Sequence, residues 1–164
     1  MLDQTSIRPY RKGDAIALAE FLEGATFLVG DDDFTPKGTH LLYFLYSERL
    51  KVIGIFEIEV AAIRHLGGDE PSLGLSKLAL LEGFVEEEYV RSVLLFLVKE
   101  ANRLNAGSLF LLGEELPFER ETGFVPAAPK GIYLSEGPEA NIPNLRIKRL
   151  QAPDAFNPGI LYRF

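Results

Sequence analysis

The spacing of apolar residues changes near residue 85, and this change predicts a buried strand followed by a long helix. Residues 73–80 form a leucine-rich run that Gly74 and Ser76 interrupt. Small residues inside a strand indicate a bulge or a close approach of another chain segment. From residue 90 onward, apolar residues recur at steps of three and four, the period of a helix, at Val90, Val93, Leu94, Leu97, Ala101 and Leu104.

The charged residues of this segment fit the two ends of a helix. Three carboxylates, Glu86, Glu87 and Glu88, fall in the predicted first turn, and Lys99 and Arg103 lie near the end. Acidic groups at the start and basic groups at the end complement the helix dipole. Asn105 and Gly107 then supply the stop signal, so the helix is expected to end near Leu104.

The rest of the chain alternates between short strands and turns. Asp14 is a predicted N-cap for a first helix that ends at Gly24, and the acidic stretch 31–33 marks a loop. Further strands are predicted at 6–10, 41–46, 52–63, 108–112, 124–127, 145–150 and 160–164, with a turn at 65–72 and a short helix at 115–122.

This order of elements predicts an α+β domain spanning residues 1–164. The hairpin of 41–46 and 52–63 comes first, and crossovers through helices follow. A mixed sheet of six to seven strands with helices on both faces is the expected architecture. In the strand 52–63, the alternation puts Glu57 and Glu59 on the face opposite Phe56.

Composition narrows the classes of function. The net charge of −7 argues against a nucleic-acid partner, because such proteins need a basic face. With no cysteine and only two histidines, His40 and His65, no metal site is expected. No signal peptide is apparent, and no apolar run reaches the roughly 18 residues of a membrane span, so we expect a cytoplasmic protein without a membrane partner.

Several local motifs appear in the order found in one large family. Ile7-Arg8-Pro9-Tyr10-Arg11-Lys12-Gly13-Asp14-Ala15 is similar to a first strand and helix start, and Leu78-Ala79-Leu80 to a Leu-Ala-Val strand end. The run 118–127, which ends Gly-Phe-Val-Pro-Ala, is similar to Phe-Tyr-x-x-x-Gly-Phe-x-Pro-Ala, and the tail 158–164 to the ending of a bacterial branch. In these features the chain resembles the GNAT superfamily of acetyl-CoA-dependent N-acyltransferases.

The resemblance implies a site and a reaction. Acetyl-CoA would be the co-substrate, its pantetheine arm pairing with the main chain of Leu78, Ala79 and Leu80 beside a strand bulge at Ser76 and Lys77. A small-molecule or peptide amine would be the acceptor, deprotonated by Glu57, Glu59 or a relayed water. Glu119 stands where the family has the tyrosine that protonates the departing thiolate. A homodimer stays open.

The pyrophosphate loop departs from the family pattern. Val85 occupies the Gln/Arg position of the loop, and Glu88 and Val90 occupy its two glycine positions. A carboxylate about 5 Å from a phosphate repels it by roughly 1–3 kcal/mol, whereas the helix dipole returns only about 0.3–1 kcal/mol. Arg91 is the nearby cation that could offset this repulsion.

Three hypotheses for function follow. The first is an N-acyltransferase, and its alternative is a catalytically silent domain that binds a ligand or protein through the former acyl-CoA cleft. The third is a module whose acidic cleft binds a cationic metabolite. Each candidate residue also has a structural interpretation: Glu86–Glu88 as helix-start chemistry, Glu57 and Glu59 as a solvated or salt-bridged strand face, and His65 as a turn residue. Tyr133 and Tyr162 are expected to pack rather than to act as acids.

Overall fold

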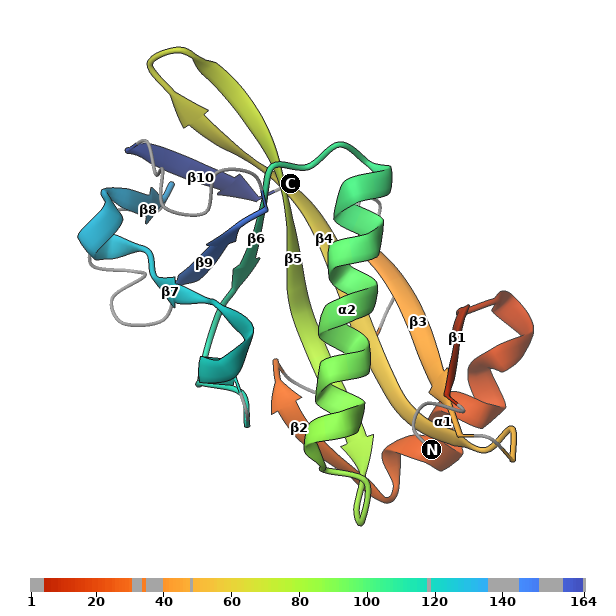
Figure 1. Cartoon of the computed structure of the whole chain (residues 1–164). Helices are drawn as coiled ribbons and strands as arrows, with labels where there is room; N and C mark the ends of the chain where they lie inside the picture. The colour runs from red at the N-terminus through yellow and green to blue at the C-terminus, as the bar shows by residue number, and fades with distance from the viewer. Residues whose placement is uncertain are drawn as a thin grey trace.

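The computed structural model describes residues 5–30, 34, 40–47, 49–117, 119–135, 145–150 and 158–163 (Figure 1). The predicted acidic loop at 31–33 and Phe118, the first residue of the 118–127 motif, fall outside this part. Short 3-10 turns lie at Lys12–Asp14, Glu119–Thr122 and Ala128–Lys130. The helices and strands are β1 (Ser6–Pro9), α1 (Ala15–Leu22), β2 (Ala25–Val29), β3 (His40–Tyr46), β4 (Val52–His65), β5 (Gly68–Leu81), α2 (Glu87–Arg103), β6 (Ser108–Leu111), β7 (Val125–Pro126), β8 (Ile132–Leu134), β9 (Arg146–Arg149) and β10 (Gly159–Arg163).

One twisted sheet connects the ten strands of the described part. Seven of them follow a single path in the order β1-β3-β4-β5-β6-β9-β7, while β2 pairs with β5, β10 with β4, and β8 with β10. The β5–β6 and β8–β10 pairs are parallel, and the other pairs are antiparallel. The predicted mixed sheet is therefore confirmed, with seven strands on the main path and three beside it.

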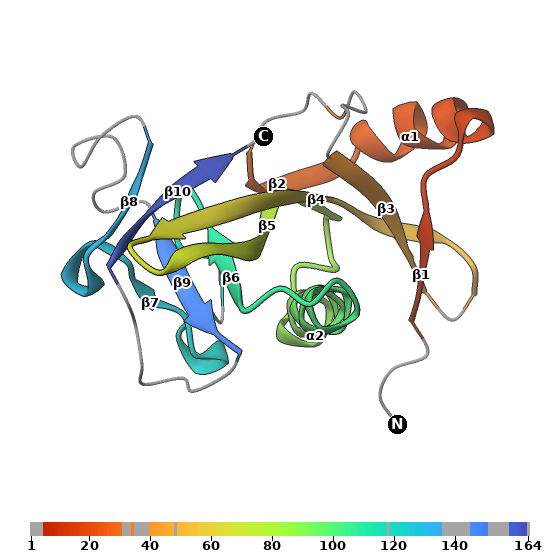
Figure 2. The ribbon, with the colours of Figure 1, turned by 90° about the horizontal axis from the view of Figure 1, so that it is seen from above.

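The two helices cover opposite faces of this sheet (Figure 2). The alternation of the central strands divides their apolar side chains between the faces, because successive residues of a strand point to opposite sides. The face under α2 buries Tyr43, Leu45, Phe56, Ile58, Leu78 and Leu80 against Val90, Val93, Leu94 and Leu97. The face under α1 buries Leu42, Phe44, Ile55 and Ala79 with Phe21 and Phe34.

The structure adds one strand to the predicted set and corrects three local predictions. The added strand is β2, which the sequence does not predict because residues 25–29 carry no strong period. β5 begins at Gly68, so most of the predicted turn at 65–72 is strand. The short helix expected at 115–122 is a 3-10 turn of four residues, Glu119–Thr122. Asp14 stands at the N-cap position but does not cap α1, because its carboxylate instead accepts hydrogen bonds from Arg8 and the Arg11 amide.

No helix in the described part of the chain is long and apolar enough to cross a membrane.

Candidate functional site

The parallel strands β5 and β6 run side by side only at one end, and we call the place where they part the fork (Figure 1). Pairing extends from Ser72 with Ser108 to Leu75 with Leu111, after which β6 ends and β5 continues to Leu81. Gly74 permits this pairing, because a Cβ on it would lie 2.2–2.6 Å from ring atoms of Phe110. The close approach predicted from the small residues of this strand is thus present at Gly74.

A β-bulge lies at the fork. Glu57 pairs with Lys77, but the next residue of β4, Ile58, pairs with Leu75, so Ser76 is the extra residue of the ladder. The Ser76 hydroxyl donates to Oε1 of Glu57 at 2.8 Å and lies 3.2 Å from the carbonyl oxygen of Glu57. The predicted bulge is confirmed, and it is coupled to one of the two strand carboxylates.

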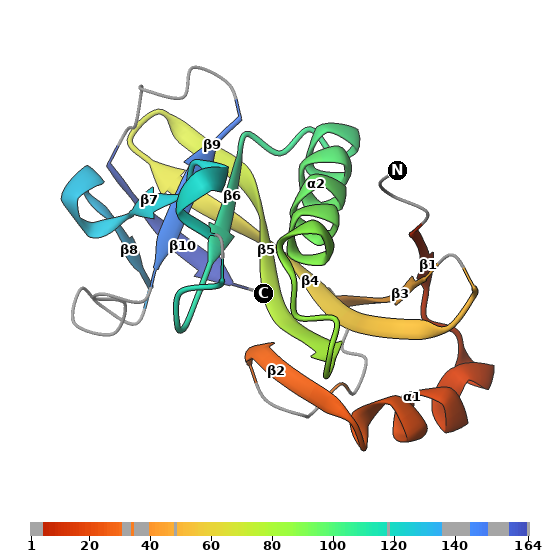
Figure 3. The same cartoon turned by 60° about the horizontal axis from the view of Figure 1, so that its bottom comes forward.

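Beyond the fork, the edge of β5 is covered by β2 (Figure 3). Ala25 pairs with Leu81, Thr26 with Leu80, Phe27 with Ala79, and Val29 with Leu78. On its other edge the same stretch pairs with β4. Gly30 follows at φ +72° and lies so close to the bulge that a Cβ there would be 2.8 Å from the carbonyl oxygen of Ser76. The main chain of Leu78, Ala79 and Leu80 is therefore paired along both edges.

Glu57 and Glu59 are both buried, with 1% and 0% of their surface exposed, so the interpretation of this strand face as solvated is wrong. Both side chains lie on the face of β4 that α1 covers. Ile55 packs on that face, and Glu57 and Glu59 follow it at steps of two residues along the strand. Glu59 accepts a hydrogen bond from Arg163 of β10 at 2.8 Å. Lys77 lies opposite Glu57 in the ladder, with its ammonium 5.7 Å from the centroid of Phe34. These contacts are those of a buried polar cluster at the fork.

Glu119 belongs to a separate ion pair on the β9 side of the sheet. Its two carboxylate oxygens accept hydrogen bonds from Nε and Nη2 of Arg146, each at 2.8 Å, and one of them also accepts from the amide of Leu116 at 2.9 Å. Only 4% of Glu119 is exposed. A buried charge needs such partners, so this arrangement accounts for Glu119 by structure alone.

The start of α2 combines exposed carboxylates with buried valines. Glu86 and Glu88 are exposed, whereas Val90 is 1% exposed and belongs to the main core; Val85 packs against that core. Arg91 forms an ion pair with Glu87 one helical turn earlier, and its guanidinium lies 4.0 Å from Glu121. The cation that could face a phosphate is thus already paired with one carboxylate and lies near a second.

Sequence reasoning missed three contributors to these clusters: β2, Arg146 and Arg163. Each comes from a segment distant in sequence, and only the β-branched and aromatic residues of 25–29 signalled a strand. Tyr162 is partly exposed beneath the Arg64 guanidinium, which lies 4.9 Å from the ring centroid. Within the residues described, no group of three or more His, Cys, Asp or Glu side chains could hold a metal ion.

The architecture is that of N-acetyltransferases. The chain superposes on the GNAT family N-acetyltransferase YhbS from Escherichia coli in complex with CoA with a TM-score of 0.73 and 18% identity, over 98% of this chain and 89% of that one. A GNAT family acetyltransferase from Brucella melitensis in complex with acetyl-CoA gives 0.59 and 14%, over 94% of each chain. The ribosomal-protein-S18-alanine N-acetyltransferase from Escherichia coli gives 0.56 and 14%, over 87% of this chain and 90% of that one.

At these identities the similarity establishes the fold. No family model matches the sequence, and no curated protein matches it.

Proposed function

We propose that this chain is an amine-binding domain with the N-acetyltransferase fold that does not transfer acyl groups. The observation that carries the proposal is the pairing of β2 with Leu78–Leu81. The family resemblance assigns this edge to the pantetheine arm of acyl-CoA. A backbone edge has one set of donors and acceptors, so β2 and a pantetheine arm exclude each other there.

The start of α2 supports the same conclusion independently. A diphosphate binds where bare amides can approach it closely, and glycine usually makes that approach available. Here Glu88 presents an exposed carboxylate, and Val90 fills the core with its side chain. Arg91 is already paired with Glu87. Among the described residues at the start of α2, the helix dipole is then the main attraction that opposes repulsion of the phosphates.

The same charges favour a cationic ligand. Glu86 and Glu88 are exposed at the start of α2, and the whole chain carries a net charge of −7. A surface of one sign raises the local concentration of counter-ions and speeds their association. A polyamine or a basic peptide amine is the class of ligand that this surface fits.

Calorimetric titration with acetyl-CoA and with spermidine tests the proposal. We expect no heat with acetyl-CoA up to about 1 mM, an affinity that corresponds to about −4 kcal/mol, and binding of spermidine that weakens with added salt. YhbS, which was crystallised with CoA, is the positive control. Binding of acetyl-CoA at micromolar concentration would overturn the proposal.

A matched pair of variants locates the amine site. Glu86→Gln with Glu88→Gln removes two exposed charges at the start of α2, and Glu20→Gln with Glu23→Gln removes two exposed charges around α1 on the other face. Spermidine binding should fall only in the first variant. An equal loss in both would show that net charge alone attracts the ligand.

A second function, acetyl transfer from acetyl-CoA to an amine, is favoured by one observation. Glu57 is buried beside the bulge, where the resemblance places the base. Glu59, the other candidate base, forms an ion pair with Arg163. This function requires β2 to leave its edge. If turnover is detected as release of free CoA, Glu57→Gln should lower kcat by about 10²–10⁴-fold, the usual contribution of a general base.

A further inference from the structure

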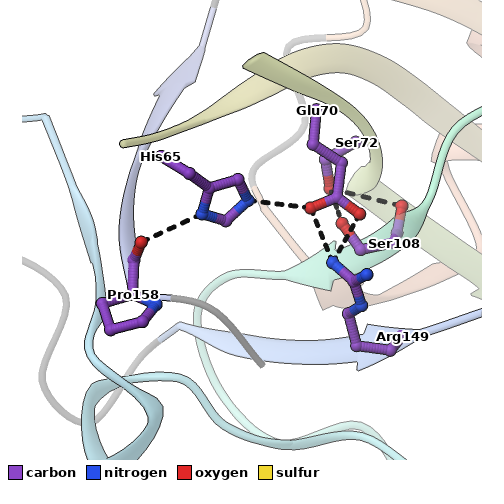
Figure 4. A network of polar contacts seen from close by, with 6 residues as sticks. All are labelled: His65, Glu70, Ser72, Ser108, Arg149 and Pro158. Carbon is purple, nitrogen blue, oxygen red and sulfur yellow. Dashed lines mark hydrogen bonds and ion pairs between the residues drawn. The ribbon is translucent and has the colours of Figure 1, made fainter. Parts of the chain in front are cut away.

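The His65 ring connects the β4–β5 hairpin to the start of β10 (Figure 4). Its Nδ1 lies 2.9 Å from the carbonyl oxygen of Pro158, directly before β10, and its Nε2 lies 2.9 Å from Oε2 of Glu70 on β5. Gly159 brings the β10 backbone so close that a Cβ there would lie 2.8 Å from Nδ1. The ring therefore sits between two segments that are about ninety residues apart in sequence.

A second ion pair extends this network to β9. Both carboxylate oxygens of Glu70 accept from Nη1 of Arg149, at 2.5 and 2.6 Å. His65, Glu70 and Arg149 are each largely buried, with 13–17% of the side chain exposed. The other charged groups nearby, Arg64 and Asp69, pair with each other at 3.2 Å.

The chemistry of the two contacts fixes the charge of the ring. A carbonyl oxygen only accepts hydrogen bonds, and the carboxylate of Glu70, paired with Arg149, also only accepts. Neutral imidazole has a single N–H, so it can satisfy one of the two contacts and places a lone pair against the other. Only the imidazolium, with two N–H groups, satisfies both.

We propose that His65 is a pH-dependent clamp that holds the start of β10 to the β4–β5 hairpin most firmly while the ring is protonated, and that this hold weakens when the neutral ring can satisfy only one of its two contacts. A cavity of about 580 Å³ lies beside the ring, lined by His65, the hairpin residues 66–70, Arg149 and Pro158. A weaker hold on β10 would also loosen Arg163, the partner of buried Glu59.

The direction of the response follows from the balance at the ring. Burial lowers the pKa of His65, but the hydrogen bonds to Pro158 and Glu70 together outweigh it and raise the pKa above its ordinary value. Since the folded pKa exceeds the unfolded value of about 6.5, the clamp contributes fully below about pH 6.5 and is lost as the pH rises through the folded pKa.

NMR titration of the two histidines tests the clamp in the full chain. We expect His65 to carry protons on both nitrogens at pH 6 and to titrate above 6.5. Amide exchange in 159–163, corrected for intrinsic rates, should accelerate through the same pH range, tenfold for each unit by which the folded pKa exceeds 6.5.

The control is the other histidine of the chain. His40→Gln should leave the pH response of 159–163 unchanged, whereas His65→Gln should abolish it. A wild-type His65 that titrates at or below 6.5, or a response that survives in His65→Gln, would overturn the proposal. The wild-type titration decides the question even if a variant folds poorly, and neither result depends on the binding of amine or acetyl-CoA.

Discussion

The hydroxyl group of Ser76 donates a hydrogen bond of 2.8 Å to Oε1 of Glu57, and this bond joins the bulge residue of β5 to a buried carboxylate of β4. The bulge places Ser76 out of the regular ladder, so its side chain can reach back toward β4. Ionised side chains are costly to bury without such donors. The hydrogen bond is therefore one reason why Glu57, 1% exposed, is tolerated at this position.

Ser76→Ala should destabilise the fold through Glu57. The variant removes one donor from a buried carboxylate, which costs about 1–3 kcal/mol, and denaturation in urea measures the change. Ser92→Ala is a matched control, because the Ser92 hydroxyl donates to the carbonyl oxygen of Glu88 within α2 and not, in the described part of the chain, to a buried carboxylate. Equal effects of the two substitutions would show that the bond to Glu57 contributes nothing special.

Gly74→Ala should be strongly destabilising, because the new methyl group would meet the Phe110 ring inside the closed part of the β5–β6 pair. Overpacking of this kind typically costs about 1–3 kcal/mol. Adding Phe110→Leu makes room and should recover part of the loss in thermal unfolding. Gly13→Ala, where a Cβ meets nothing within 4 Å, should change stability little; a similar loss there would contradict the steric explanation.

Arg146→Met should lower the free energy of unfolding more than the double variant Arg146→Met with Glu119→Gln does. The single change leaves the Glu119 carboxylate buried without its guanidinium, a loss of about 3–5 kcal/mol in comparable pairs. The second change removes the stranded charge and keeps an oxygen for the Leu116 amide. A double-mutant cycle in urea measures the coupling. Additive losses would mean that the two side chains do not support each other.

The sequence predicted the elements whose signals are local. The helical period of 90–104, the small residues of 73–80 and the alternation of 52–63 each describe one segment and its immediate neighbours. They therefore predicted α2, the bulge and the placement of Glu57 and Glu59 opposite Phe56, but not that both faces of β4 are buried. The order of the elements along the chain predicted the mixed sheet, whereas the order of the strands within it came only from the structure. Val90, however, shows why aligned positions need the structure: it stands at a glycine position of the family and is also a core residue.

The missed features depend on partners that are remote in sequence. Residues 25–29 become a strand because the edge of β5 is vacant beyond the fork, and the pairing of Arg146 with Glu119 or of Arg163 with Glu59 joins segments with no shared pattern. The charge of His65 likewise depends on Pro158, which lies ninety-three residues later. Such contacts are properties of the assembled sheet rather than of any single window.

Proline substitutions in β2 should distinguish the edge that pairs with β5 from the edge that does not. Successive N–H groups of a strand point to opposite edges, so of Thr26 and Phe27 one directs its N–H toward β5 and the other away. Proline removes a ladder bond at the first position and is tolerated at the second, as on edge strands. Only one of Thr26→Pro and Phe27→Pro should therefore accelerate amide exchange at 78–81, and the other is its matched control.

The detached variant then shows which barrier to acetyl-CoA is larger. With β2 released, the pantetheine arm of acetyl-CoA can pair with the free edge of β5. The carboxylates at the start of α2 still repel the diphosphate of the coenzyme by roughly 1–3 kcal/mol. We expect no calorimetric heat from the proline variant alone and measurable binding once Glu86→Gln and Glu88→Gln are added. Binding by the proline variant alone would show that β2 is the whole barrier. Its absence from the combined variant would mean that this cleft is no longer a coenzyme site even when open, because the bulk at Val90 still prevents close approach.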